Sequence, residues 1–167
     1  MSDAGGRVAE GLEARIPSRP LVYLHAGQVI VSREPSAVTT ILGSCVAVCL
    51  WDPLLGAGGM NHFLLPHWAG NGDSSPRFGN VAVQGLVQQM LRLGSRTANL
   101  QAKVFGGACV LGAFRARAEH LGTKNVQVAR AVLAAEGIPI VAEDAGGDRG
   151  RKVIFHTDDG TVWIRRL

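Results

Sequence analysis

One cysteine and one histidine have the residue types and the spacing that best suit chemistry in this sequence. Cys45 follows the break Gly43-Ser44 and precedes a short apolar run, and His62 lies beyond a Gly-rich segment. Two neighbouring strands joined by a tight turn would bring the imidazole within hydrogen-bond reach of the thiol, the pairing that activates a cysteine nucleophile. Free backbone N–H groups at the break could hold an oxyanion. We therefore expect Cys45 to be rich in thiolate near neutral pH.

The same two residues also allow a purely structural interpretation. A cysteine among valines and leucines is commonly a buried, unreactive thiol, and a histidine in a strand is commonly held by structural hydrogen bonds. From residue types and spacing alone, both interpretations stay open.

A zinc site is the next alternative, because Cys45, Cys49, His62 and His67 have the spacing of a Cys2His2 zinc finger. Such a finger places both histidines on one helix, whereas here Pro66 stands directly before His67. We therefore expect no structural zinc, and a reaction carried by a thiol and an imidazole needs no metal or organic cofactor. A disulfide between Cys45 and Cys49 is not expected either, because positions four apart on an extended strand lie about 13 Å from each other.

The composition indicates one domain of ordinary size. The chain has 167 residues, of which 47% are hydrophobic and 18% charged, with a formal net charge of +4. This is too apolar for a disordered protein and sufficient for a hydrophobic core. The apolar run 41–51 is too short to span a bilayer. We expect no secretory signal, because the chain does not open with a basic region followed by an apolar one. We expect a cytoplasmic protein without membrane insertion.

The basic residues are scattered, and aromatic residues make up only 5% of the chain. This pattern does not favour nucleic-acid binding, which uses basic patches interleaved with aromatic side chains. A mildly basic face suits an acidic protein surface better.

Hydrophobic patterning predicts a flexible N-terminal extension over residues 1–20 and a single domain over residues 21–167. Strands come first and helices then alternate with strands, which indicates an α+β domain. Asn125 is expected to cap the second helix, and residues 56–59 are expected to form a turn. The predicted strands are 21–23, 28–33, 37–42, 46–51, 60–65, 100–105, 138–142, 152–156 and 161–166, and the predicted helices are 80–93 and 125–136.

Several motifs, taken together and in order, resemble the CheD family of chemoreceptor glutamine deamidases. The resemblance extends from about residue 27 to residue 167. Its motifs are LGSCV at 42–46, WDP at 51–53, GGMNHFLLP at 58–66 and AKVFGGA at 102–108, with further likeness at 122–125, 146–147 and 151–153.

The resemblance implies an α+β fold with the layers α/β/β/α, that is, two mixed sheets flanked by helices. This fold is similar to the catalytic domain of cytotoxic necrotizing factor toxins. The implied activity is that of a protein-glutamine glutaminase, which converts glutamines of methyl-accepting chemotaxis receptors to glutamate and releases ammonia. The receptors are then the substrate, and the CheC phosphatase is an implied partner.

The resemblance also assigns roles to individual residues. The family's nucleophile falls on Cys45, which would form a thioester with the substrate, and its general base falls on His62. Its third member, a threonine six residues before the cysteine, falls on Thr39. The neighbouring Thr40 competes for this role, which is to orient the imidazole.

Three more residues are expected at the site. Gly43, Ser44 and Asn61 are expected to hold the oxyanion or to position the substrate. A different class of function remains as the alternative, a non-catalytic adaptor that binds receptor or CheC without turnover.

Overall fold

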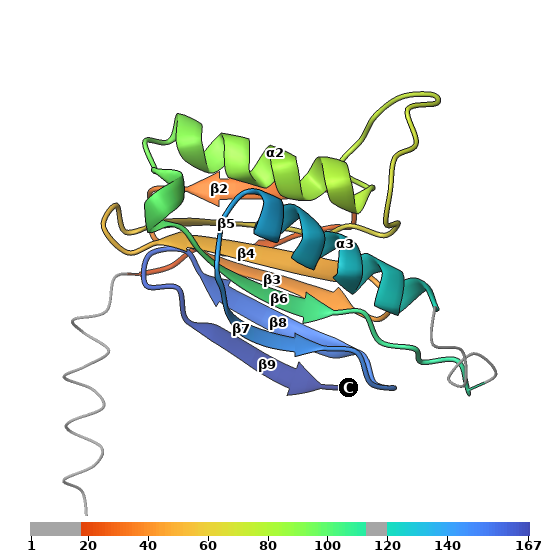
Figure 1. Cartoon of the computed structure of the whole chain (residues 1–167). Helices are drawn as coiled ribbons and strands as arrows, with labels where there is room; N and C mark the ends of the chain where they lie inside the picture. Colours follow the sequence, from red (N-terminus) through yellow and green to blue (C-terminus); the bar gives the residue numbers. More distant parts are fainter. Residues whose placement is uncertain (1–17, 113–119) are drawn as a thin grey trace, which may run out of the picture.

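The computed structural model describes residues 18–112 and 120–167. They form two stacked sheets with two α-helices packed on one of them (Figure 1). The four-stranded sheet has the order β1-β3-β8-β9 and the five-stranded sheet the order β2-β5-β4-β6-β7. Both sheets are mixed, because β1 is parallel to β3 and β6 is parallel to β7, while the other neighbours are antiparallel.

The elements of the described chain follow one another in a simple order. They are β1 (Leu21–Tyr23), β2 (Val29–Ser32), β3 (Ala37–Leu42), β4 (Val46–Asp52), β5 (Ala57–Asn61), α2 (Gly79–Arg92), the 3-10 helix η1 (Thr97–Asn99), β6 (Gln101–Gly106), α3 (Leu121–Ala135), β7 (Ile140–Ala145), β8 (Arg151–His156) and β9 (Val162–Arg166).

This architecture confirms the predicted α+β fold with two packed mixed sheets. The two helices, α2 and α3, contact β2, β4, β5, β6 and β7, which all belong to the five-stranded sheet. No described helix covers the outer face of the four-stranded sheet (Figure 1). Residues 18–112 and 120–167 therefore form the layers α/β/β. They do not form the second helical layer of the expected sandwich.

Strand β4 is buried on both faces and separates two cores. Val46 and Val48 face the helices and pack in the core that contains Leu86. Ala47 and Cys49 face the other sheet and pack in the core that contains Phe155 and Val153. Because side chains alternate along a strand, a strand covered on both faces is apolar almost without interruption, which is the pattern that predicted it.

The expected turn at residues 56–59 is wrong, because Gly58 and Gly59 lie inside β5. A Cβ atom at Gly58 would lie 2.7 Å from the Thr157 carbonyl oxygen, and one at Gly59 would lie 2.5 Å from Val31 Cγ1. These glycines therefore let neighbouring backbone and side chains approach the strand closely. The strand predicted over 60–65 accordingly begins earlier and ends at Asn61.

The first predicted helix and the terminal hairpin are confirmed, but the start of α3 differs from the prediction. The helix begins at Leu121, and the His120 side chain accepts a hydrogen bond from the Thr123 backbone N–H (3.2 Å). Asn125 is therefore no cap. It lies fully buried in the second turn of the helix.

The domain begins before Leu21. Arg19 forms an ion pair with Asp158 (2.7 Å), and the Pro20 carbonyl accepts a hydrogen bond from Ala37 N (2.9 Å). The rest of the expected N-terminal extension, residues 1–17, lies outside the described residues. Neither described α-helix has the length and hydropathy that crossing a membrane requires.

Candidate active site

Residues 43–45 form the turn in which the chain passes from β3 in one sheet to β4 in the other. The carbonyl of Gly43 accepts a hydrogen bond from Ala108 N (2.9 Å), and the carbonyl of Cys45 accepts one from Gly107 N (2.9 Å). Both donors belong to the segment that follows β6. The turn is therefore held against the end of β6 through its carbonyl oxygens.

The N–H groups of this turn remain available. Among the described residues, none accepts a hydrogen bond from the backbone N–H of Gly43 or Ser44. The N–H of Cys45 interacts with its own sulfur, which opposes the upward shift of the thiol pKa. Consecutive backbone N–H groups beside a nucleophile are the donors that an oxyanion hole uses.

The sheet register places Cys45 and His62 on the same face. Val46 and Phe63 form an antiparallel bridge, with Val46 N to Phe63 O at 3.1 Å and Phe63 N to Val46 O at 2.9 Å. In the same register, His62 lies opposite Ala47, whose side chain faces the space between the sheets. Cys45 is the diagonal neighbour of His62 on that face, within reach of a long or aromatic side chain. The strand pairing that the sequence suggested is thus confirmed.

Thr40 is the hydroxyl that contacts His62. Its Oγ1 lies 2.8 Å from His62 Nδ1 and donates to the Leu24 carbonyl at 2.7 Å. The hydroxyl of Thr39 instead donates to the Val153 carbonyl at 3.0 Å. The expectation that Thr39 orients the imidazole is therefore not met. Alternate residues of β3 face opposite sides of the sheet, and Thr40 is the one that faces the other sheet.

This hydrogen-bond chain assigns the tautomer of His62. Because the single proton of the Thr40 hydroxyl is donated to Leu24 O, its oxygen must accept from His62 Nδ1–H. The neutral imidazole then carries its lone pair on Nε2. That is the form a general base needs, with Nδ1 anchored and Nε2 free.

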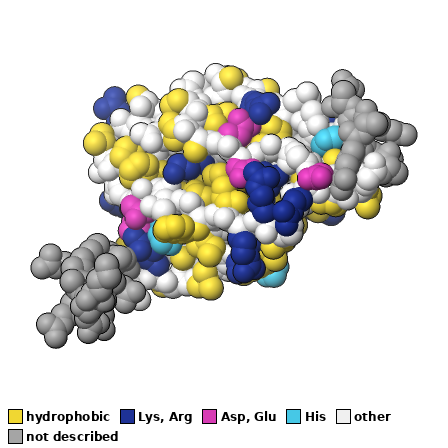
Figure 2. All heavy atoms as spheres, turned by 90° about the horizontal axis from the view of Figure 1, so that it is seen from below, with side chains coloured by type: hydrophobic (Ala, Val, Ile, Leu, Met, Phe, Trp, Pro, Cys, Tyr) yellow, Lys and Arg dark blue, Asp and Glu magenta, His cyan; other side chains and the backbone are white. Residues whose placement is uncertain are grey.

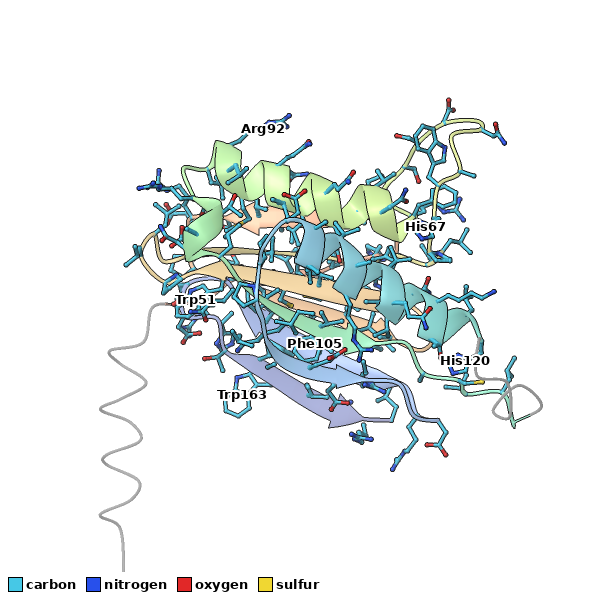
Figure 3. All side chains as sticks on the ribbon, in the orientation of Figure 1. Trp51, His67, Arg92, Phe105, His120 and Trp163 are labelled. Atoms are coloured by element: carbon cyan, nitrogen blue, oxygen red, sulfur yellow. The ribbon has the colours of Figure 1, made fainter. Side chains whose placement is uncertain are left out.

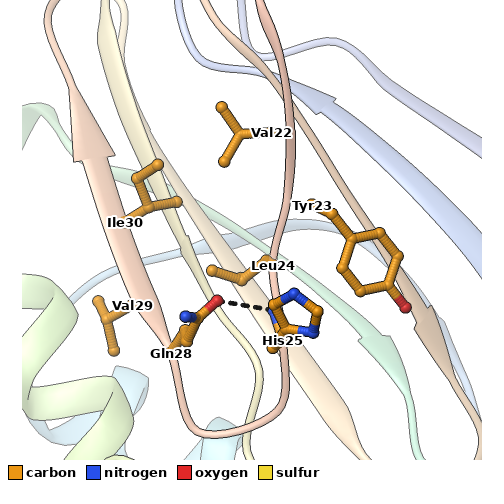
Figure 4. A pocket seen from close by; sticks show the side chains of 7 residues that line it. All are labelled: Val22, Tyr23, Leu24, His25, Gln28, Val29 and Ile30. Atoms are coloured by element: carbon orange, nitrogen blue, oxygen red, sulfur yellow. Dashed lines mark hydrogen bonds between the residues drawn. The ribbon is translucent and has the colours of Figure 1, made fainter.

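Loop 24–28 closes over the backbone of His62. Gly27 N donates to His62 O (2.7 Å), and His62 N donates to Gln28 O (3.2 Å). The loop is itself braced by His25 N, which donates to Gln28 Oε1 at 2.8 Å (Figure 4). Beside it lies a cavity of about 440 Å³, lined by Val22, Tyr23, Leu24, His25, Gln28, Val29 and Ile30. The imidazole is therefore anchored through its ring and its backbone.

Burial keeps both reacting groups neutral. It raises the pKa of the half-buried Cys45 thiol and lowers the pKa of the His62 imidazole. For His62, the hydrogen bond to the Leu24 backbone opposes this shift and the charge of His25 adds to it. Near neutral pH the pair is thus thiol and imidazole. The expected thiolate-rich Cys45 is wrong, because desolvation disfavours the charged form.

Asn61 does not join this group. Its Oδ1 accepts a hydrogen bond from Val48 N (2.8 Å), and it lies opposite Val48, whose side chain faces the helices. Cys45 and His62 face the other way. The expected substrate-positioning role for the Asn61 side chain does not fit this geometry, in which it joins two strands behind the site.

Asn125 is a site residue that sequence reasoning missed. Its Nδ2 donates to two carbonyls, Ser44 O and Leu64 O, each at 3.0 Å. Ser44 precedes the nucleophile, and Leu64 is the register position opposite Cys45. One side chain from α3 therefore ties together the two segments that carry the thiol and the imidazole.

The other cysteines lie away from this arrangement. Cys49 is buried in the core between the sheets, and burial raises its pKa strongly. Cys109 is buried beyond the end of β6 and donates to Leu111 O (3.5 Å). All three cysteines are free thiols. Within residues 18–112 and 120–167, no three histidine, cysteine, aspartate or glutamate side chains are grouped as a metal site requires.

Comparison with known proteins assigns the chain to a family. A family model described as "CheD chemotactic sensory transduction" matches residues 64–166. A curated relative from Anaeromyxobacter dehalogenans, named probable chemoreceptor glutamine deamidase CheD 1, is 57% identical over 149 residues, which cover 89% of this chain and 86% of the relative. The chain belongs to the CheD family.

Other CheD proteins give the same result. The relative from Trichlorobacter lovleyi is 46% identical over 86% of this chain and 89% of its own, and that from Sulfurimonas denitrificans is 41% identical over 86% and 92%. Both are named probable chemoreceptor glutamine deamidase CheD. An alignment of 149 of the 167 residues has to contain the segment from Cys45 to His62. Among solved structures, the Bacillus licheniformis hypothetical protein YfiH matches with a TM-score of 0.47 and 16% identity, over 69% of this chain and 49% of that one.

Proposed function

We propose that this CheD protein deamidates glutamine side chains of chemoreceptors, with Cys45 as the nucleophile and His62 as the general base. The observation that carries the proposal is the placement of this thiol and this imidazole on one face, with Thr40 anchoring Nδ1. The names of the relatives supply the substrate class. CheC remains the proposed partner, on the family resemblance alone.

The reaction begins from the neutral pair. A primary amide is a weak electrophile, so the attacking group has to be a thiolate. As the Cys45 sulfur approaches the amide carbon, its proton passes to His62 Nε2. The low pKa of the imidazole keeps Nε2 unprotonated before the attack. The resulting imidazolium donates through Nδ1–H to Thr40, which keeps the ring in position.

The tetrahedral intermediate carries a negative oxygen. The backbone N–H groups of Gly43, Ser44 and Cys45 supply the donors for it, because their carbonyls, and not their N–H groups, are bound to the rest of the domain. Asn125 fixes the middle carbonyl of the turn and is a positioning residue. Donors that are fixed before the reaction need no reorganisation when charge develops.

Three proton transfers complete the cycle. His62 gives its proton to the leaving nitrogen, the carbon–nitrogen bond breaks, and ammonia leaves a thioester on Cys45. A water molecule then attacks the thioester while His62 takes its proton. The carbon–sulfur bond breaks, the thiol regains a proton, and glutamate remains on the substrate. The net reaction consumes one water per glutamine.

The test is incubation of the full chain with the cytoplasmic fragment of a chemoreceptor. We expect ammonia release together with the mass increase of a glutamine-to-glutamate conversion in receptor peptides, and neither with Cys45→Ala. Free glutamine at the same concentration should react far more slowly, because a protein substrate supplies remote binding energy that orients the amide. Binding of the fragment without ammonia release would instead establish the adaptor function.

A further inference from the structure

The outer face of the four-stranded sheet carries large exposed apolar side chains. Tyr23, Ile41 and Trp163 are 47%, 48% and 60% exposed, respectively. Among residues 18–112 and 120–167, no helix covers this face. Figure 2 views the molecule from this side and shows apolar side chains across its middle with Lys and Arg side chains beside them. Trp163 projects from this side of the sheet (Figure 3).

The sheet register arranges this face in rows. One row crosses all four strands through Tyr23, Thr39, Ile154 and Trp163. The neighbouring row consists of Ile41, Lys152 and Arg165. A shallow hollow of about 150 Å³ lies on the side of β8 and β9, lined by Lys152, Ile154, Trp163, Ile164 and Arg165. An apolar floor and two cations therefore occupy the same surface.

The two cations are directly opposite each other. Lys152 pairs with Arg165 across β8 and β9, and like charges in this position repel each other. No described carboxylate forms an ion pair with either side chain. The carboxylate of Asp144, at the neighbouring sheet edge, is bound by Arg151 and Arg166. Within residues 18–112 and 120–167, the positive charge of this row is thus left uncompensated, which favours an anionic partner.

The row of Ile41, Lys152 and Arg165 lies next to the turn of the candidate active site. Ile41 lies two residues before Gly43, and the next register pair, Leu42 with Arg151, ends the β3–β8 ladder. The turn with the unpaired N–H groups begins directly after it. An extended segment of a protein bound at that turn can therefore reach Ile41, Lys152 and Arg165.

We propose that this face docks an acidic segment of the substrate protein, next to the glutamine that Cys45 attacks. The proposal rests on the proposed function. Carboxylates of the segment would pair with Lys152 and Arg165, and an apolar side chain would cover the hollow beside Trp163. Such contacts add binding energy remote from the reacting amide and select acidic surroundings of the target glutamine.

The test compares two double charge reversals in the full chain. Lys152→Glu with Arg165→Glu changes the docking face. Arg92→Glu with Arg96→Glu makes the same charge change at two exposed positions, Arg92 in the last turn of α2 (Figure 3) and Arg96 just before η1. Kinetics with the receptor cytoplasmic fragment should show KM raised about tenfold by the first pair, with kcat nearly unchanged, and little change from the second. High salt should raise the wild-type KM and have less effect on the docking-face variant.

Binding is measured separately, with the same changes on a Cys45→Ala background and a labelled receptor fragment. Weaker binding from the docking-face pair alone supports the surface, even if the wild type releases no ammonia and the proposed function fails. Equal affinity for both pairs would overturn the proposal. So would a wild-type dimer that Trp163→Ala dissociates, tighter binding after removal of residues 1–17, or charge-dependent binding to phosphatidylserine vesicles with unchanged fragment binding. These results would assign the face to a second copy, to the N-terminal segment or to a membrane, respectively.

Discussion

Replacing Thr40 by valine tests the anchoring of the base with little change in shape. The substitution removes one hydroxyl and keeps the β-branched side chain inside the sandwich. In the structure, this hydroxyl donates to Leu24 O at 2.7 Å and lies 2.8 Å from His62 Nδ1. With valine at this position, the buried Leu24 carbonyl and the His62 Nδ1–H both lose this hydroxyl as a hydrogen-bond partner.

The expected magnitudes follow from these two hydrogen bonds. A buried polar group left without its partner costs about 1–3 kcal/mol. The Leu24 carbonyl also interacts with the His62 ring, so it keeps one partner. We therefore expect Thr40→Val to lower the free energy of unfolding by about 2 kcal/mol. The loss of one hydrogen bond that favours the Nδ1–H tautomer, worth about 1–1.5 kcal/mol, should lower kcat about tenfold, with KM nearly unchanged.

Thr39→Val is the matched control, because it makes the same chemical change one residue away. The Thr39 hydroxyl donates to Val153 O at 3.0 Å and does not contact His62. We expect a loss of about 1 kcal/mol in unfolding free energy and an unchanged kcat. The assays are urea unfolding, ammonia release from a receptor cytoplasmic fragment, and nitrogen NMR shifts of the His62 ring, which report its tautomer. A larger loss of kcat in Thr39→Val than in Thr40→Val would refute the assignment.

Other outcomes test the remaining parts of the site. Cys45→Ala and His62→Ala should each abolish ammonia release, and the double variant should lose no more than either, because the two groups act as one unit; additive losses would contradict a shared proton transfer. The acid limb of kcat/KM against pH should have its midpoint below 6.5, because burial lowers the pKa of His62 and activity is lost as the imidazole gains its proton; a midpoint above 6.5 would favour a preformed ion pair. Limiting iodoacetamide with peptide mapping should label Cys45 before the buried Cys49 and Cys109, and the reverse order would contradict the assigned nucleophile. Asn125→Leu should lower the unfolding free energy by about 2 kcal/mol, and kcat should fall further than in an equally destabilised core variant, since two backbone carbonyls lose their donor.

The pairing of Cys45 with His62 could be predicted because it depends on short-range features. An apolar run followed closely by a second strand predicts an antiparallel pair, and this pairing holds although the connection is residues 53–56 and not the expected turn at 56–59. The choice between Thr39 and Thr40 could not be predicted in this way. Apolar residues of β3 lie on both faces of the strand, Val38 and Leu42 on one and Ile41 on the other. Hydropathy therefore does not reveal whether Thr39 or Thr40 faces the other sheet. Only the packed structure decides it, and it leaves Ile41 half exposed.

Local rules also misassigned Asn125. An asparagine near the start of an apolar-periodic segment is a favoured N-cap, and Gly122 just before it weakens the case for an earlier helix start. In the structure the helix nevertheless begins at Leu121, because His120 supplies the cap. The amide of Asn125 is then free to bind carbonyls 61 and 81 positions away in the sequence. Such partners leave no periodic signal, so no sequence pattern could have indicated them.

The glycines after β6 show how distant parts of the fold create the proposed oxyanion donors. In the sequence, Gly106-Gly107 stands out only as part of the AKVFGGA motif at 102–108. In the structure both have positive φ, and a Cβ atom at Gly106 would overlap the carbonyl oxygen of Cys45. Because that space is empty, the end of β6 approaches closely enough for Gly107 N and Ala108 N to bind the carbonyls of the turn. The Gly43 carbonyl and the Ser44 N–H belong to one peptide unit and point in opposite directions, so the bond from Ala108 N turns the Ser44 N–H away from β6, beside the nucleophile.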